Sequence, residues 1–240
     1  MGVPYRHLNA ERIVETIAGL QARIDARFPG SGLGRVCREL GQIAAKARER
    51  AAWIARPIIP LRVAAALVSL LIVAGLAGAI SRLRVAGEQF SLLDFAQLLE
   101  SGINDLVLTG AAIWFLLSLE TRIKRHRALA AIHEMRAIAH VIDMHQLTKA
   151  PETVLGQSPT AGEGTGRVLS SEELALYLDY CSEMLSLTGK VAVLYVQGFD
   201  DGAARDGVND VEELTTGLSR KIWQKMTVVR SAGEAARLAP

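Results

Sequence analysis

Histidine is the residue type in this sequence whose spacing most suggests chemistry. His126, His133 and His140 follow one another at intervals of seven residues, and His145 comes five residues later. Seven residues make almost two turns of an α-helix, so the three evenly spaced imidazoles share one stripe of such a helix. Asp143 stands three residues after His140 and could join it as a ligand or orient it through a hydrogen bond. These five residues are the candidate metal ligands.

The spacing of the histidines limits what they can bind. Imidazole nitrogens hold zinc at about 2 Å, whereas residues seven apart on a helix lie roughly 10.5 Å apart along its axis. Ligands for one ion would therefore have to come from neighbouring helices or chains. Three interpretations stay open: a metal site between chains, a seam that responds to pH, and a packing interface with hydrogen-bonded imidazoles. We expect the packing interface, and hence no bound cofactor.

The residues between the histidines favour packing. Ala130, Ala137 and Met144 share the histidine stripe. The ordinary apolar face of the same segment lies roughly opposite and consists of Ala128, Ile132, Met135, Ile138 and Ile142. A helix with two faces poorly suited to water is expected to contact other helices on both sides. The sequence therefore predicts a homo-oligomer whose chains meet through residues 120–148.

The remaining motifs do not indicate catalysis. The glycine-rich residues 30–34 lack the Lys-Ser/Thr pair of a phosphate loop, and the acidic residues between 200 and 210 lack the spacing of a calcium-binding EF-hand loop. No metalloprotease motif and no nucleophile motif is present. Cys37 and Cys181 belong to no CxxC pair and are interpreted as small apolar residues. We therefore expect no catalytic residue and no enzyme.

Composition points to a membrane protein. Half of the residues are apolar, only 5% are aromatic, and the formal net charge is +2. So small a charge provides no general basic field, and nucleic acid is not among the expected partners. The apolar residues are concentrated in two uncharged blocks, 63–80 and 106–119. The expected partners are the lipid bilayer, other copies of the chain, and a protein at the cytoplasmic face.

The two apolar blocks differ in length. Residues 63–80 would make a helix of roughly 27 Å, close to the ~30 Å hydrocarbon core of a bilayer. Residues 106–119 reach only about 21 Å, so a re-entrant or buried segment is the alternative to a second span. We expect both blocks to span. Gly75 and Ala79 have the small-xxx-small spacing that lets membrane helices pack closely.

Charge around the two blocks predicts their orientation. Five basic residues stand close before the first block and four close after the second, whereas only two lie in the connecting loop with four acidic residues. By the positive-inside rule both termini face the cytoplasm. The expected location is a bacterial plasma (inner) membrane, with a multi-pass topology. The basic residues are Lys46, Arg48, Arg50, Arg56 and Arg62 before the first block, and Arg122, Lys124, Arg125 and Arg127 after the second.

The predicted fold is an all-α membrane protein with a transmembrane helical hairpin and cytoplasmic amphipathic helices at both ends. Apolar residues recur at helical spacing in most segments, with helix caps expected at Asn9 and, as a capping box with Glu173, at Ser170. A last helix is expected from about 207 to 229. The predicted organisation is 1–57, a cytoplasmic helical hairpin; 58–119, the membrane region, with helices 62–80 and 106–119 and an outer loop and short surface helix at 81–105; 120–148, a cytoplasmic extension; 149–169, a flexible linker; and 170–240, a C-terminal helical segment.

Two functions from different classes fit these expectations. The first is a non-enzymatic, membrane-anchored assembly or adaptor protein that self-associates through cytoplasmic helices and recruits a protein partner. The alternative is an ion- or pH-responsive membrane module, such as a small channel, transporter subunit or sensor, that uses the histidine-lined helix. Neither apolar block contains an ionisable residue. Since intramembrane ionisable residues commonly mark ion pathways, their absence from these blocks favours the first function.

Overall fold

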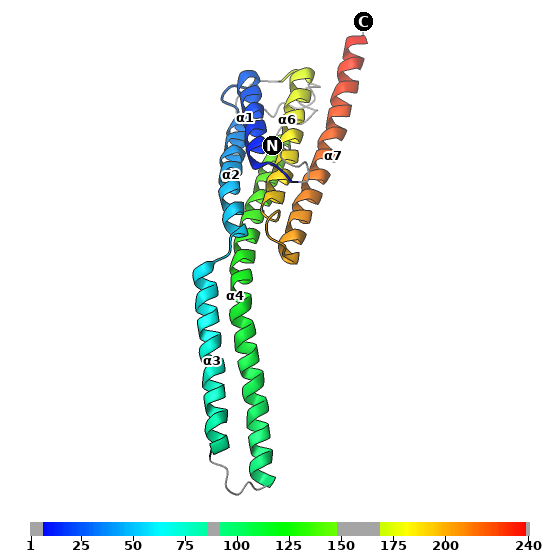
Figure 1. The fold of residues 1–240 in the computed structure, drawn as a ribbon. Helices are drawn as coiled ribbons and strands as arrows, with labels where there is room; N and C mark the ends of the chain where they lie inside the picture. The colour runs from blue at the N-terminus through cyan, green and yellow to red at the C-terminus, as the bar shows by residue number, and fades with distance from the viewer. Residues whose placement is uncertain (1–6, 86–91, 148–168, 239–240) are drawn as a thin grey trace. The chain divides into compact units, whose positions relative to one another are not determined.

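Helices form the whole of the regular structure in the computed structural model, which describes residues 7–85, 92–147 and 169–238 (Figure 1). No strand occurs in those ranges, so the all-α prediction is confirmed for them. The expected linker at 149–169 lies almost wholly outside the described residues. The helices are α1 (Ala10–Arg27), α2 (Gly32–Ala55), α3 (Ile59–Val85), α4 (Leu92–Leu147), α6 (Ser171–Leu194) and α7 (Gly202–Leu238).

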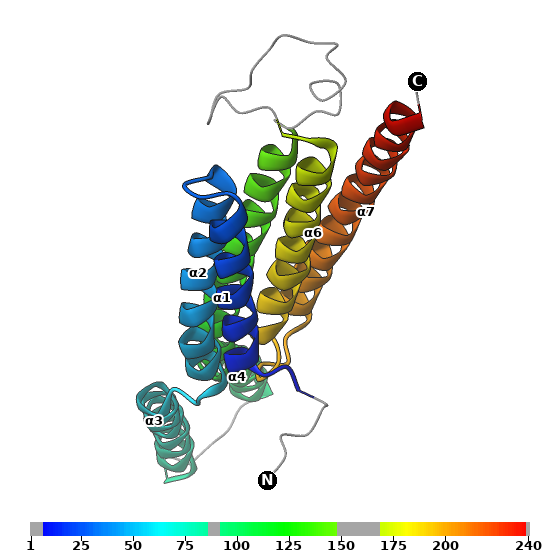
Figure 2. The same ribbon diagram turned by 90° about the horizontal axis from the view of Figure 1, so that it is seen from above.

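The chain divides into two units. The first combines residues 1–55 with residues 127–240, and the second consists of residues 56–126. The first unit is a bundle made from α1, α2, the last part of α4, α6 and α7 (Figure 2). Its helix α6 is apolar on most sides, and 13 of its residues are buried. A helix that is apolar all round belongs in the interior, and α6 provides the centre of this core.

Side-chain caps fix where several bundle helices begin. Asn9 Oδ1 accepts hydrogen bonds from the backbone N–H groups of Glu11 and Arg12. Ser170 and Glu173 form a reciprocal capping box at the start of α6. Both predicted caps are confirmed, and each satisfies backbone donors that have no partner within the helix.

Helix α7 begins earlier than the sequence pattern predicts. The expected start was near residue 207, but the helix starts at Gly202. The reason is the side chain of Asp201, which is 4% exposed and accepts a hydrogen bond of 3.1 Å from the backbone N–H of Ala204. An aspartate in this position caps a helix, and its negative charge interacts favourably with the positive end of the helix dipole. One member of the acidic group at 200–210 therefore has a structural role.

The second unit contains α3 and the first part of α4. Helix α3 extends the predicted helix 62–80 in both directions. The predicted short surface helix is not a separate element: α4 runs without interruption from Leu92 to Leu147 and includes the expected boundary at Asp105. No proline occurs between these ends. Since charged residues do not end a helix in the way that proline does, the sequence offers no break there.

Two stretches are long and apolar enough to cross a membrane. One lies within Gly32–Gly75 and includes the start of α3, and the other lies within Gly102–Leu147 of α4. A core helix of a soluble protein can be as long and as apolar, but it is mostly buried. Here the chain buries only 6% of the most apolar 18-residue window in the first stretch and 0% of that in the second. The apolar side chains of these windows therefore face outward.

Candidate interaction surfaces of the helical bundle

The histidine stripe lies on the open side of α4. His126, His133 and His140 are exposed, as are Ala130 and Ala137 between them. Met144 extends the same stripe and is 61% exposed. The opposite face of α4 is buried in the bundle core through Ala128, Ile132, Met135, Ile138 and Ile142. The chain itself thus covers one of the two weakly polar faces that the sequence predicts and leaves the other uncovered.

The other two candidate metal ligands lie away from this stripe. Asp143 Oδ1 accepts a hydrogen bond of 2.5 Å from Gln146 Nε2. His145 packs on the start of α2, where its Cε1 atom lies 2.6 Å from the place that a Cβ on Gly32 would occupy. Over the ranges that the structure describes, no group of three or more His, Cys, Asp or Glu side chains could hold a metal ion. One chain therefore does not bring the predicted ligands together.

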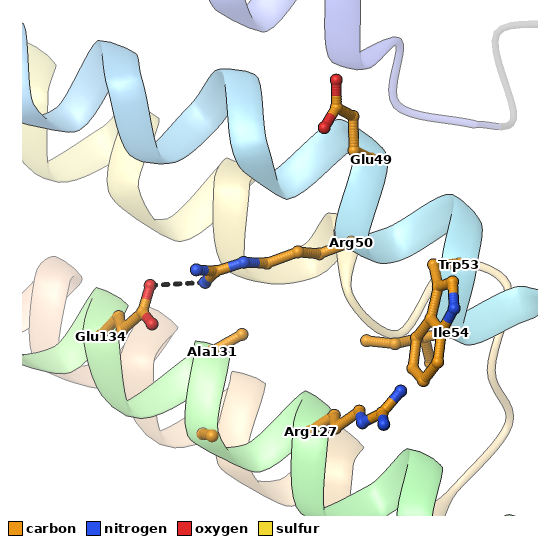
Figure 3. Close-up of a pocket in the computed structure, with 8 residues that line it drawn as sticks. Glu49, Arg50, Trp53, Ile54, Arg127, Ala131 and Glu134 are labelled. Carbon is orange, nitrogen blue, oxygen red and sulfur yellow. Dashed lines mark hydrogen bonds and ion pairs between the residues drawn. The ribbon is translucent and has the colours of Figure 1, made fainter.

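An open groove of 580 Å³ runs between α2 and α4 in the bundle (Figure 3). At one end the guanidinium of Arg127 lies over the indole of Trp53, with 3.7 Å between Cζ and the ring centroid. Further along, Arg50 forms an ion pair of 2.8 Å with Glu134. The groove is lined by Glu49, Arg50, Trp53, Ile54, Arg127, Ala130, Ala131 and Glu134. It combines a cation–π pair, an ion pair and an apolar floor.

A buried tyrosine lies next to the ion pair of this groove. Tyr195 is 1% exposed, and burial raises the pKa of its phenol, while the nearby charge of Arg50 partly opposes that rise. In the described part of the chain its hydroxyl has no hydrogen-bond partner of ordinary geometry. The raised pKa keeps the phenol neutral at physiological pH. Tyr195 thus acts as a packing residue behind the groove.

A second, smaller groove of 330 Å³ lies between α4 and α7. Charged groups of both signs surround it, together with two leucines and a glycine. Its lining residues are Arg136, Asp210, Glu213, Leu214, Gly217, Leu218 and Lys221. Mixed charges around a small apolar patch are typical of the rim of a protein interface.

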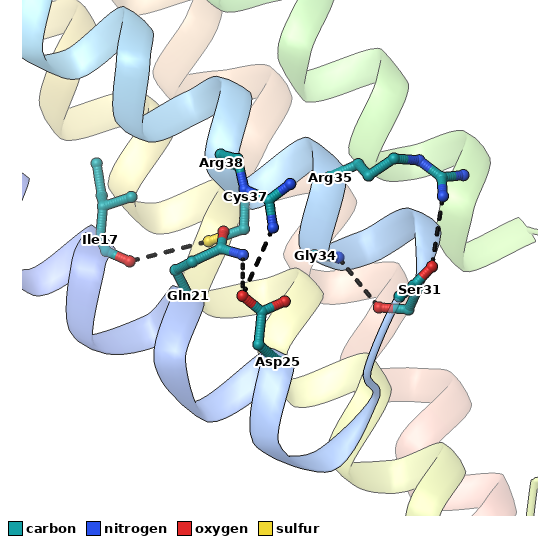
Figure 4. A network of polar contacts seen from close by, with 9 residues as sticks. Ile17, Gln21, Asp25, Ser31, Gly34, Arg35, Cys37 and Arg38 are labelled. Carbon is teal, nitrogen blue, oxygen red and sulfur yellow. Dashed lines mark hydrogen bonds and ion pairs between the residues drawn. The ribbon is translucent and has the colours of Figure 1, made fainter.

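The glycine-rich residues 30–34 complete the turn after α1 and begin α2, and polar contacts between the two helices support them (Figure 4). Gly30 takes a left-handed conformation with φ of 69°, which glycine adopts without steric cost. The hydroxyl of Ser31 accepts a hydrogen bond of 3.1 Å from the N–H of Gly34. Asp25 accepts a bond of 2.7 Å from Gln21 and faces Arg38 at 3.7 Å. These residues connect two helices.

Both cysteines lie in the bundle core. Cys37 and Cys181 are each 0% exposed. Burial raises the pKa of the Cys37 thiol to about 11 and that of the Cys181 thiol to about 12. The thiolate is the nucleophilic form, so both groups are poorly reactive in the folded state. Their position agrees with the interpretation of both residues as small apolar side chains.

Gly75 of α3 makes no close contact with the described part of the chain. Gly75 is exposed, and no atom lies within 4 Å of a Cβ built on it. The side chain of Ala79 lies outside the described residues. The predicted small-residue interface at these two positions therefore stays a prediction.

The groove between α2 and α4 is the surface that the sequence analysis did not find. In the sequence its basic residues indicate only membrane orientation, and no pattern connects Trp53 with Arg127. The fold and surfaces define a helical bundle whose chain is interrupted by two long, apolar, outward-facing helical stretches. Comparison with protein-family models, curated proteins and solved structures finds no match for this chain.

Proposed function

We propose that this protein is a non-enzymatic, membrane-anchored assembly or adaptor protein of a bacterial inner membrane. Residues of α3 and of the first part of α4 form a transmembrane hairpin, and the helical bundle lies in the cytoplasm with both termini. The exposed apolar side chains of the two stretches support a lipid environment, because in water they would form an unusually large apolar surface. The basic residues that flank them support the orientation.

The orientation is tested by labelling single cysteines with a membrane-impermeant reagent in intact spheroplasts. A cysteine at Glu88, in the connecting loop, is expected to react from outside, and a cysteine at Ala235 is expected to react only after the membrane is permeabilised. Cys37 and Cys181 are replaced by alanine beforehand. Reaction of both introduced cysteines from the same side would contradict the two-span topology.

The observation that carries the proposed assembly function is the open histidine stripe of α4. The bundle covers the opposite face of this helix, whereas the stripe of imidazoles and small side chains has no cover within the described chain. In a cyclic assembly, chains with the same orientation in one membrane are related by an axis along the membrane normal. Two α4 helices would then pair in parallel, with His133 opposite His133 of the second copy. Small residues on the stripe allow such a close approach.

Recruitment of a protein partner is the second part of the proposal. The groove between α4 and α7 supports it, since it presents both signs of charge around Leu214 and Leu218. Such a surface suits a helical segment with alternating charges and an apolar residue between them. On α4 this groove borders the stripe, since Arg136 lies about one turn from both His133 and His140.

Self-association is tested by placing a charge in the stripe. Ala137→Arg is expected to convert the oligomer into a monomer, because it puts like charges opposite each other across a parallel interface. Thr216→Arg on the exposed side of α7 is the matched control and should leave the assembly intact. The measurement is native mass spectrometry of the full chain in detergent at micromolar concentration. A monomeric wild-type protein would exclude the assembly. A transition metal that is bound by the wild-type protein and lost in the variant His133→Gln would favour the ion-responsive alternative.

A further inference from the structure

The cation–π pair Arg127–Trp53 presents a cation that no acid of the groove neutralises. The guanidinium of Arg127 lies over the indole, with its Cζ atom 3.7 Å from the ring centroid, and none of the described carboxylates forms an ion pair with it, whereas Arg50 in the same groove is bound to Glu134. Stacking on a ring fixes the plane of a guanidinium and leaves its N–H edges free to bind an anion. The indole of Trp53 is 41% exposed, so a ligand can approach it. The pair is therefore prepared for a planar, two-pronged contact with an anion.

The surroundings of the pair suit an anion that carries apolar groups. Ile54 and Ala131 line the adjoining floor of the groove and are 2% and 3% exposed within the fold. A free inorganic anion would gain nothing from such a floor. A phosphodiester with glycerol and methylene groups beside its charge could contact both the guanidinium and the apolar floor.

The position of Arg127 along α4 brings it near the lipid headgroups, given the membrane placement proposed above. It follows the end of the second apolar block by eight residues, or about 12 Å of helix. The headgroup layer extends roughly 5–7 Å beyond the hydrocarbon on each side. Side chains lean toward the N-terminus of their helix, which for this part of α4 is the direction of the apolar block. A long arginine side chain can span the remaining distance.

The second unit contains the same combination of residues. Arg122 lies over Phe115 and Trp114, with 5.1 Å and 5.8 Å from its Cζ atom to the two ring centroids. Trp114 is 65% exposed. Tryptophan and arginine are both favoured at the level of the headgroups. A second arginine–tryptophan contact, which reaches into the end of the second apolar block, supports a lipid environment at this level.

We propose that the Arg127–Trp53 pair is a binding site for the phosphodiester headgroup of an anionic phospholipid. The acyl chains stay in the bilayer, the phosphate accepts hydrogen bonds from the edge of the guanidinium, and the glycerol backbone packs on the indole and the groove floor. The inference rests on the proposed membrane anchoring and adds a specific lipid class and site to it. It differs from diffuse attraction to a negative surface, because it requires both the planar guanidinium and the ring beneath it.

The test is native mass spectrometry of the full-length protein in detergent, titrated with phosphatidylglycerol or with phosphatidylcholine. One phosphatidylglycerol per chain is expected to bind more tightly than any phosphatidylcholine. Arg127→Gln is expected to weaken this binding roughly tenfold or more, the loss of one charge-assisted contact. Trp53→Leu and Arg127→Lys should each weaken it clearly, since the first removes the ring and the second removes the planar donor. Circular dichroism confirms that each variant keeps its helices.

The matched control is Arg56→Gln, which removes the same charge from an exposed arginine close to the start of α3. Its effect on phosphatidylglycerol binding should be small. Equal losses in Arg56→Gln and Arg127→Gln would reduce the binding to diffuse electrostatics and overturn the site. Equal binding of both lipids, or displacement by millimolar inorganic phosphate, would also overturn it, the latter in favour of a soluble phosphate ligand. If the cysteine labelling shows two spans while the lipid titration fails, only this inference is lost.

Discussion

Glu120→Leu is expected to destabilise the second unit by about 3–5 kcal/mol, the usual cost of removing one partner from a buried ion pair. Glu120 accepts a hydrogen bond of 2.8 Å from Lys124, whose side chain is buried, and one of 2.5 Å from Arg62. It also accepts the backbone N–H of Ile58 at 3.3 Å, immediately before α3 begins. The leucine variant would leave the ammonium group of Lys124 buried without this acid, and the start of α3 without one acceptor.

The measurement for Glu120 is thermal unfolding of the purified protein in detergent, followed by circular dichroism. The double variant Glu120→Leu with Lys124→Met is expected to recover much of the loss, because it removes the uncompensated charge as well. Arg62→Gln should cost less, since the side chain of Arg62 is 62% exposed and water already screens its charge. A single variant as stable as the wild type would show that the cluster does not connect the two helices.

Leu185→Ala is expected to destabilise the first unit by roughly 2–5 kcal/mol, the range for a leucine removed from a close-packed core. Leu185 is 0% exposed and lies near the middle of α6, the helix around which the bundle packs. Because α6 is buried on most sides, neighbouring helices cannot close the cavity without losing other contacts.

The Leu185 prediction is checked by denaturant unfolding of the full chain in detergent, with the helical signal recorded against denaturant concentration. Trp223→Ala is the control, since this tryptophan on α7 is 67% exposed and its removal should change stability little. If the two variants unfold at the same denaturant concentration, then α6 is not the centre of the core.

The sequence predicts the helices of the bundle well because each one carries its own signals. Ile13, Ile17, Leu20 and Ile24 recur at helical spacing and form the buried face of α1, and the capping residues Asn9 and Ser170 stand at the predicted helix starts. These signals are local, since a helix needs only residues within a turn or two to define its face and its ends. The continuity of α4 is harder to predict. Residues 100–105 contain a glycine and two acids, which resemble the boundary of an apolar helix, but none of them is strong enough to end the helix.

The candidate surfaces could be predicted only in part. Helical periodicity places His126, His133 and His140 on one stripe, and the structure shows that stripe exposed. Helical periodicity alone does not predict that His145, five residues further on, points toward α2, as it does in the structure. The groove depends on pairs such as Arg50 and Glu134, which are 84 positions apart. No local pattern relates residues so distant, because their proximity results from the packing of the whole bundle.

The division of the bundle into two chain segments has a consequence for its biosynthesis. Residues 1–55 leave the ribosome first, but their partners on α6 and in the turn after it come much later: Arg23 pairs with Glu183, 160 positions on, and Leu8 bonds with Gln197, 189 positions on. At ordinary rates of translation this delay is on the order of ten seconds. During that time the apolar faces of α1 and α2 lack the cover of α6, and both apolar stretches emerge before the bundle can close. A nascent chain of this kind has to stay protected from aggregation while its second unit is delivered to the membrane.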